Sequence, residues 1–292
     1  MTQKGEIKVR LFRYDPGSGE APRYEGVSVP RRPDMRILDV LNHIYDRDEQ
    51  SSLAYRWFCG TKKCGECGLM VNGKPMLGCW EPALDEMTLE PLANLPIIRD
   101  LVVDTEPYER MLLDLQPIVR RSHPPDFPEK LPHSQMRGAH ELLKCIECNV
   151  CTATAPVARL GKAGVDWTGY SGPAALVRFA RFVLDPRDEL DRKPLALKAG
   201  LRDFPLYDSL RKICPQGIDI VDDALIPAQK KLFGSSSEVP KTVDLTAPLV
   251  VAKSWSAFVR LTRERKQQLV ADGTLQARNF PEITEAYSLV EL

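Results

Sequence analysis

The chain has 292 residues, of which 43% are hydrophobic and 27% are charged, a composition typical of soluble proteins. Its 40 Lys and Arg residues balance its 40 Asp and Glu residues, so net charge favours neither nucleic acid nor an anionic membrane. No apolar run approaches the roughly 18 residues of a membrane span, and the first residues lack the apolar region of a signal peptide. We therefore expect a cytoplasmic protein without a transmembrane segment of its own, reaching the cytoplasmic face of a membrane only through partners.

The first part of the chain predicts a small sheet crossed by one helix. Residues 6–14 alternate apolar and charged side chains, as strands do, and residues 23–29 are suited to be the hairpin partner. Residues 35–45 come next, with apolar side chains at helical spacing at Ile37, Val40, Leu41 and Ile44. Two strands and a crossing helix before a cysteine-rich loop indicate a ferredoxin-like β-grasp.

That loop carries Cys59, Cys64, Cys67 and, after eleven residues, Cys79. C-x4-C-x2-C with a later cysteine is the ligand spacing of plant-type [2Fe–2S] ferredoxins. Gly60, Gly65 and Gly68 permit tight turns that can direct backbone N–H groups at the sulfur atoms, which stabilises a negatively charged cluster. Asn72-Gly73 is a hairpin signal that returns the chain to Cys79.

Beyond the loop, residues 87–92 are predicted as the last strand of this domain, and helices dominate the remainder of the chain. We expect helices over 105–121, ended or kinked at Pro117, and over 134–143, 173–185 and 207–213, with a proline-rich loop at 122–133. The predicted fold is α+β, in three parts. These are a [2Fe–2S] β-grasp domain (1–104), an all-helical, bacterial-ferredoxin-like [4Fe–4S] domain (105–233), and a C-terminal extension (234–292).

A second cysteine run, Cys145, Cys148 and Cys151, precedes Pro156 with Ala155 where the bacterial ferredoxin run has its fourth cysteine. That fourth cysteine normally ligates the other cluster of a two-cluster protein, so its loss leaves this site intact. The site needs a distant cysteine followed by proline, and Cys214-Pro215 is the candidate. We predict one [4Fe–4S] cluster on these four residues.

The eight cysteines thus divide into two sets of four with none left over. Structural zinc is the alternative, because zinc also takes four thiolates, although zinc modules more often use two separate C-x2-C pairs. Disulfides are disfavoured in a chain without a secretion signal. No nucleophilic triad, phosphate loop or dinucleotide fingerprint stands out, so we assign no catalytic residue.

Two cluster motifs in this order resemble the iron–sulfur subunit of succinate dehydrogenase and fumarate reductase. The resemblance covers roughly residues 6–225 and rests on CGTKKCGECGLMVNGKPMLGC, PLANLPIIRDLVVD, CIECNVC, YSGPAALVRFARFVLDPRDE and CPQG. It implies an electron relay in which a separate flavoprotein holds FAD and performs the hydride chemistry. In the family, [2Fe–2S], [4Fe–4S] and [3Fe–4S] clusters then lead to a quinone in a membrane anchor. The resemblance implies that Cys214 is the fourth [4Fe–4S] ligand. It also implies that the Cys67 loop, near Lys62 and Lys63, faces the flavin of the partner.

The sequence departs from this family at the [3Fe–4S] site. The three ligand positions that the resemblance implies are occupied by Ala155, Phe204 and Leu210, which are apolar and suited to a packed core. The aromatic residue on the quinone side is absent as well, since Pro156 is followed by Val-Ala-Arg. We therefore predict no [3Fe–4S] cluster, and direct quinone reduction by the usual route is not expected.

The predicted function is that of a non-catalytic electron-transfer subunit, which links an FAD flavoprotein to another redox subunit or membrane anchor. The alternatives are a freestanding two-cluster carrier that docks transiently with several partners, and a scaffold with structural zinc. The extension has a predicted helix at 255–272 and is expected to dock a partner, although a solvated helix packed on its own domain fits its charge equally well.

Overall fold

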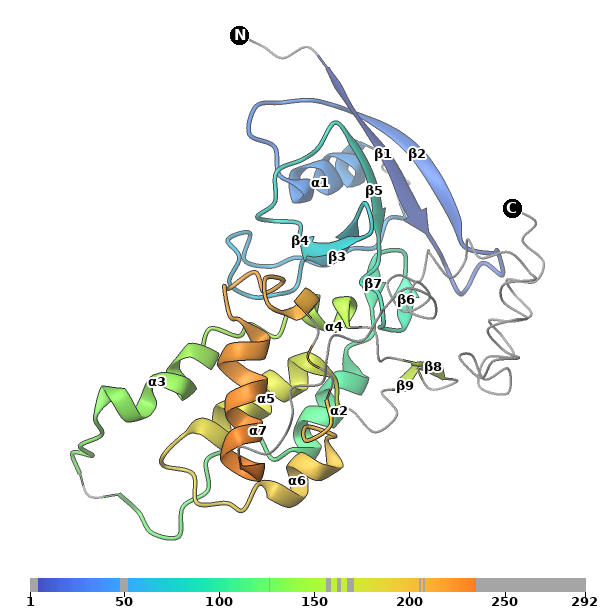
Figure 1. Ribbon diagram of the computed structural model, residues 1–292. Coiled ribbons are helices and arrows are strands. Elements are labelled where there is room, and N and C mark those ends of the chain that lie inside the picture. The colour runs from blue at the N-terminus through green and yellow to red at the C-terminus, as the bar shows by residue number, and fades with distance from the viewer. Residues whose placement is uncertain are drawn as a thin grey trace. The chain divides into compact units, whose positions relative to one another are not determined.

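The computed structural model describes residues 5–47, 52–125, 127–155, 159–161, 164–166, 171–204, 206 and 208–234. These residues form two compact units, the first within Met1–Thr105 and Glu147–Asp166 and the second within Glu106–Ile146 and Trp167–Asp244. The fold is mixed α+β, with the sheet at the N-terminal end of the chain and most helices after it (Figure 1). The helix predicted at 255–272 lies outside the described residues.

The first unit is built on a five-stranded sheet of order β2-β1-β5-β3-β4. Strands β1 (Glu6–Arg13) and β2 (Arg23–Pro30) form the predicted antiparallel hairpin. β3 (Gly68–Val71) and β4 (Lys74–Leu77) form a second hairpin around Asn72-Gly73, both with positive φ as the turn signal predicts. β5 (Glu86–Glu90) joins the hairpins, because it pairs parallel with β1 and antiparallel with β3.

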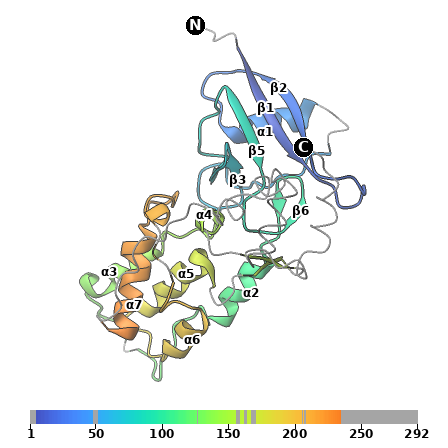
Figure 2. The same cartoon turned by 45° about the vertical axis from the view of Figure 1, so that its right-hand side comes forward.

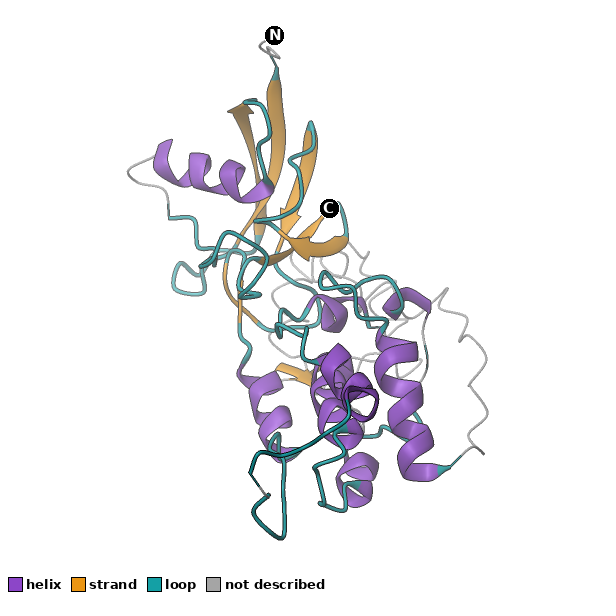
Figure 3. Ribbon diagram, turned by 90° about the vertical axis from the view of Figure 1, so that its left-hand side faces the viewer, coloured by secondary structure: helices purple, strands orange, loops and turns teal. Residues whose placement is uncertain are grey.

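Helix α1 (Ile37–Arg47) covers one face of this sheet (Figure 3). The apolar residues predicted from its periodicity, Ile37, Val40, Leu41 and Ile44, are all buried. They join one core cluster with inward side chains of β1 and β5, among them Val9, Leu11, Met87 and Leu89. Alternation along the strands and helical spacing along α1 therefore supply the two sides of the same core.

Smaller elements complete the first unit. Strands β6 (Ile97–Arg99) and β7 (Val102–Val103) form a ribbon after the sheet. Helix α4 (Val150–Thr154) carries Cys151 and belongs to this unit, as do the short paired strands β8 (Arg159–Gly161) and β9 (Gly164–Asp166).

The second unit is helical. It contains α2 (Glu106–Asp114), α3 (His133–Leu142), α5 (Gly172–Leu184), α6 (Lys193–Lys198), the turn η1 (Asp208–Leu210), the π-helical segment η2 (Ile220–Leu225) and α7 (Ile226–Phe233). Helix α5 is central, since it contacts α2, α3, α7 and η2 (Figure 2). Ten of its thirteen residues are buried, and alanines at three of these positions let neighbouring helices approach closely. No helix in the described part of the chain is long and apolar enough to cross a membrane.

Two details of the predicted helical region are wrong. The range 105–233 is not all helical, because β8 and β9 lie within it; Gly161 and Gly164 are poor helix formers and flank their connection. The stretch predicted as a helix at 207–213 contains, in its described residues, only the single turn η1. Pro215 disfavours helical backbone at Cys214, so a helix could not continue through that cysteine. Helix α2 ends at Asp114, before Pro117.

One buried arginine holds the second unit together. Arg192 forms two bonds with the Asp188 carboxylate, Nε to Oδ2 at 2.7 Å and Nη2 to Oδ1 at 3.0 Å. Its remaining N–H groups donate to the carbonyls of Leu115, Gln116 and Ile118. The Arg192 and Asp188 side chains are 1% and 3% exposed. All five donors of the guanidinium are therefore used, and the chain after α2 is fixed to the segment before α6.

Arg192→Met should lower the free energy of unfolding by about 3–5 kcal/mol, because it removes the charged partner of the buried Asp188 carboxylate and the Arg192 donors to three carbonyls. Denaturant unfolding followed by circular dichroism measures this change. Arg202→Met is the control, since Arg202 pairs with Asp203 on an exposed surface and should change stability by less than about 1 kcal/mol. Equal effects of the two substitutions would contradict the assigned role of Arg192.

Candidate iron–sulfur centres

The first cysteine set surrounds the β3–β4 hairpin. Cys59 and Cys64 lie in the loop between α1 and β3 and are partly exposed, whereas Cys67 directly precedes β3 and Cys79 comes after β4, and both are buried. The hairpin register places Gly68 opposite Leu77, so the chain segments carrying Cys67 and Cys79 leave the same end of the hairpin. Cys79 N–H donates to Cys67 Sγ at 3.4 Å.

Backbone N–H groups point at all four sulfur atoms of this set. Cys59 Sγ accepts from the N–H groups of Thr61, Lys63 and Cys64, at 3.4, 3.2 and 3.3 Å. Cys64 Sγ accepts from Cys59 N–H at 3.5 Å, and Cys79 Sγ from Lys62 N–H at 3.4 Å. Such donors stabilise thiolates, the form of cysteine that binds iron. The donor set and its hydrogen bonds therefore fit a thiolate-held cluster.

The predicted glycines serve this loop in two ways. Gly60 and Gly65 have φ of 67° and 83°, so they make the turns that point N–H groups inward. Gly68 has no positive φ, and its role is close approach. A Cβ at this position would lie 2.9 Å from Leu92 Cδ1 and 3.2 Å from the carbonyl oxygen of Cys148. The backbone beside Cys67 thus lies against that of Cys148.

Hydrogen bonding and burial move two thiol pKa values in opposite directions. Backbone N–H donors, first that of Thr61 and then that of Lys63, lower the pKa of Cys59 to about 6. Burial raises the pKa of Cys67 to about 12. Without metal, Cys59 is therefore largely a thiolate at neutral pH, while Cys67 stays protonated. Metal binding must displace that proton, because thiolates are the ligands.

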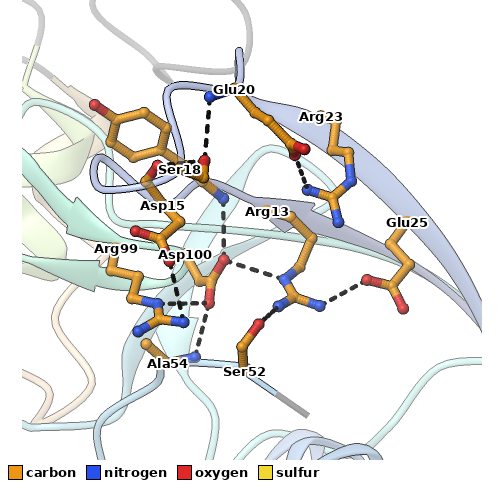
Figure 4. Close-up of polar contacts among 11 residues, drawn as sticks. Arg13, Asp15, Ser18, Glu20, Arg23, Glu25, Ser52, Ala54, Arg99 and Asp100 are labelled. Atoms are coloured by element: carbon orange, nitrogen blue, oxygen red, sulfur yellow. Dashed lines mark hydrogen bonds and ion pairs between the residues drawn. The ribbon is translucent and has the colours of Figure 1, made fainter. Parts of the chain in front are cut away.

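The segment that leads to Cys59 is held by a buried carboxylate that the sequence analysis missed. Asp100, 2% exposed, accepts from Ala54 N–H at 2.8 Å, from Tyr14 N–H at 3.0 Å and from Arg13 Nε at 3.1 Å (Figure 4). Arg13 also bonds Ser52 Oγ at 2.7 Å. The end of β1, the β6–β7 turn and the chain before the cysteine loop are thereby fixed to one another. The sequence indicated this role only by placing an Asp within the largely apolar stretch LPIIRDLVVD.

A second feature that the sequence analysis missed lies on the loop surface. Lys62 Nζ lies 5.1 Å from the ring centre of Trp80, and the Arg36 guanidinium lies 5.9 Å from the same ring. Lys62 has a φ of 58°, unusual for a residue with a side chain. The Lys62 backbone N–H donates to Cys79 Sγ, and the Lys62 side chain lies over the ring of Trp80, the residue after Cys79. The backbone and the side chain of Lys62 therefore both attach the cysteine loop to the chain at Cys79 and Trp80.

The second cysteine set is divided between the two units. Cys148 and Cys151 belong to the first, and Cys145 and Cys214 to the second. All four are partly exposed. Glu147 and Asn149, on either side of Cys148, both have a φ of 57°, so the run turns sharply at each spacer. Their grouping around one [4Fe–4S] cluster stays a prediction from their spacing.

Ala155, Phe204 and Leu210, the positions where the family resemblance implies lost [3Fe–4S] ligands, are each 0% exposed. Their side chains are thus enclosed by protein, as expected of core residues.

Within the described ranges, no three or more His, Cys, Asp and Glu side chains are placed to hold a metal ion. A [2Fe–2S] cluster differs from a single-ion site, since its four ligands are shared between two irons.

The opposite pKa shifts predict selective alkylation of the metal-free chain. At pH 7, iodoacetamide should modify Cys59 well before Cys67, because the thiolate is the reactive form and Cys67 is both protonated and buried. Peptide mass spectrometry after timed quenching measures the order. Equal rates in the folded chain would contradict the assigned hydrogen bonds, and urea-unfolded chain is the control in which the difference should vanish.

Comparison with known proteins identifies an iron–sulfur domain that contains the first cysteine set. A model of the 2Fe-2S iron–sulfur cluster binding domain matches residues 8–110, which include the whole first cysteine set. The fumarate reductase iron–sulfur subunit of Haemophilus influenzae is 32% identical over 239 residues, 75% of this chain and 90% of that protein. One of the subunits of the CoM/CoB fumarate reductase of Methanothermobacter marburgensis is 30% identical over 259 residues.

The latter alignment covers 82% of this chain and 50% of the archaeal protein, so the chain spans about half the length of that relative. Among solved structures, a chain of the Mycobacterium smegmatis Sdh1 complex in the apo form superimposes with a TM-score of 0.67 at 26% identity. This match covers 78% of the present chain and 96% of the other. The chain therefore belongs to the family of iron–sulfur subunits of succinate dehydrogenase and fumarate reductase.

Proposed function

We propose that the chain is an electron-transfer subunit that carries one [2Fe–2S] and one [4Fe–4S] cluster and lacks a [3Fe–4S] cluster. Cys59, Cys64, Cys67 and Cys79 hold the first cluster, in a β-grasp domain that spans 1–104. Cys145, Cys148, Cys151 and Cys214 hold the second, in a domain of bacterial-ferredoxin type within 105–233. The observation that carries the proposal is the loop in which backbone N–H groups donate to the sulfur of all four N-terminal cysteines.

The partner in this proposal is an FAD flavoprotein of the fumarate reductase type, which performs the hydride chemistry. When bound, iron–sulfur clusters accept and release single electrons. The residues of this chain supply the ligands, the hydrogen bonds to sulfur and the burial of Cys67 and Cys79, all of which tune reduction potentials. A further redox subunit or membrane anchor receives or supplies the electrons at the other end, and the segment 234–292 is a candidate to dock it.

The surface near Cys59 supports docking of that flavoprotein. Trp57 and Phe58, which precede Cys59, are 50% and 80% exposed, and Trp80, next to Cys79, is 47% exposed. Exposed aromatic side chains of this kind are enriched where partners bind. Lys62 and Lys63 lie in the same loop and would favour an acidic rim on the partner.

Cysteine substitutions test the cluster assignment by iron content. Cys64→Ser should remove the [2Fe–2S] cluster and lower iron from about six to about four atoms per chain, whereas Cys214→Ser should leave about two, because it opens the [4Fe–4S] site. Iron and acid-labile sulfide are measured in anaerobically purified protein, and each variant is the control for the other. An unchanged iron content in Cys214→Ser would contradict its assignment as a ligand.

Removal of the exposed Phe58 ring should weaken flavoprotein binding at least about tenfold, the effect expected of a buried interface aromatic. Titration of the holo-chain with the fumarate reductase-type flavoprotein of the same organism measures the dissociation constant of Phe58→Ala. Phe127→Ala is the matched control, since Phe127 is 97% exposed and lies in the other unit. If no stable complex forms with the wild-type chain, the freestanding carrier is the better description.

A further inference from the structure

The side-chain amide of Asn94 connects the chain after β5 to the short helix that carries Cys151. Asn94 Nδ2 donates to the carbonyl of Thr152 at 3.0 Å and to that of Ala155 at 2.8 Å. The side chain is buried, 7% exposed. From these contacts we infer that Asn94 is a positioning residue, which holds helix α4, and with it Cys148 and Cys151, in place for the second cluster. This inference rests on the proposed function.

Helix α4 needs an external support because it spans only five residues. An isolated helix of this length is unstable in water, and its last carbonyls have no partner within the helix. The chain itself provides one bond to each of two carbonyls, from Ala155 N–H to those of Cys151 and Thr152, both at 3.2 Å. Asn94 adds the two bonds that come from a distant part of the sequence.

The other end of α4 is fixed locally. Asn149 precedes the helix and is 3% exposed. Its Oδ1 accepts from Thr152 Oγ1 at 3.0 Å, and its Nδ2 donates to the carbonyl of Glu147 at 3.2 Å. Both bonds stay within the cysteine run. They shape the turn around Cys148, but they do not attach α4 to the rest of the unit.

Attachment comes from the surface beneath the helix. Ala153 packs in an apolar cluster with Met70 of β3 and with Leu92, Ala93, Leu95 and Val103. The Cys148 carbonyl lies against Gly68, as described above. Apolar packing is tolerant of small shifts along a surface, whereas two hydrogen bonds from one amide fix position and direction. The two Asn94 hydrogen bonds therefore fix the position and direction of α4 on that surface.

The backbone at Asn94 allows a clean test. Its φ is 63°, in the left-handed region that Gly and Asp also tolerate. Asn94→Gly removes both donors without backbone strain, and Asn94→Asp replaces the donor with an acceptor that faces two carbonyl oxygens. If only the backbone shape mattered, both variants would behave as wild type.

Asn72 provides the matched control. It is also left-handed, with a φ of 49°, and its side chain also bridges backbone groups, donating to Glu86 carbonyl at 3.2 Å and accepting from Thr88 N–H at 2.7 Å. These bonds tie the β3–β4 turn to β5 and leave α4 untouched. Asn72→Gly therefore removes a comparable amide from the same unit.

The full-length holoprotein is exposed to the iron chelator bathophenanthroline, and both clusters are measured by EPR in samples that are withdrawn at intervals and reduced. We expect Asn94→Gly and Asn94→Asp to lose the [4Fe–4S] signal at least about tenfold faster than wild type. Substituting a residue that orients a metal ligand typically weakens metal binding by this factor or more. The [2Fe–2S] signal should decay at the wild-type rate and report an intact fold. Asn72→Gly should match wild type for the [4Fe–4S] signal, because its bonds do not reach α4.

Wild-type loss rates in both Asn94 variants would overturn the inference, and so would an equal acceleration for both clusters, since that would show a general loss of fold. A wild-type chain that never shows a [4Fe–4S] signal would instead overturn the proposed function. The two failures are thus distinguished before any variant is compared.

Discussion

The proposed first cluster, held by four thiolates, would be negatively charged, and the need for hydrogen-bond donors that offset this charge is the constraint on which the first unit depends. The backbone provides these donors, since N–H groups donate to every sulfur of the first cysteine set. Such a loop has little apolar surface of its own, so rigid neighbours must hold it. Asp100 fixes its beginning to β1, and the β3–β4 hairpin fixes its end.

The same scaffold supports part of the second cysteine set. Because Gly68 is the residue directly after Cys67 and lies against the Cys148 carbonyl, no side chain separates the two stretches of backbone at that point. Asn94 comes from the segment that also contains Asp100, and this single stretch therefore contacts both cysteine-bearing regions of the first unit. Electron transfer between centres depends on fixed spacing, so a shared rigid support is what a relay protein requires.

Local signals in the sequence were sufficient for local structure. The β1–β2 hairpin, α1, the Asn72-Gly73 turn and α5 were predicted because alternation, helical periodicity and turn residues specify them within a few residues. The parallel pairing of β1 with β5 had no such signal, because it joins segments that are far apart in the sequence. The hydrogen bonds of Asn94 and Asp100 were not predicted for the same reason, because their partners lie dozens of residues away in the sequence. The helix predicted at 207–213 was wrong, since the described residues there contain only the turn η1, and a stretch of seven residues carries too little periodicity to specify a helix.

The central claim is the proposed relay with two clusters and no third, in which apolar residues stand at the three positions where the family resemblance implies [3Fe–4S] ligands. Low-temperature EPR of the anaerobically purified chain, recorded before any reductant is added, tests it most directly. The account predicts no oxidised [3Fe–4S] signal, and then, on reduction, [2Fe–2S] and [4Fe–4S] spectra. A stoichiometric [3Fe–4S] signal in the protein as isolated, retained after anaerobic reconstitution with iron and sulfide, would contradict it.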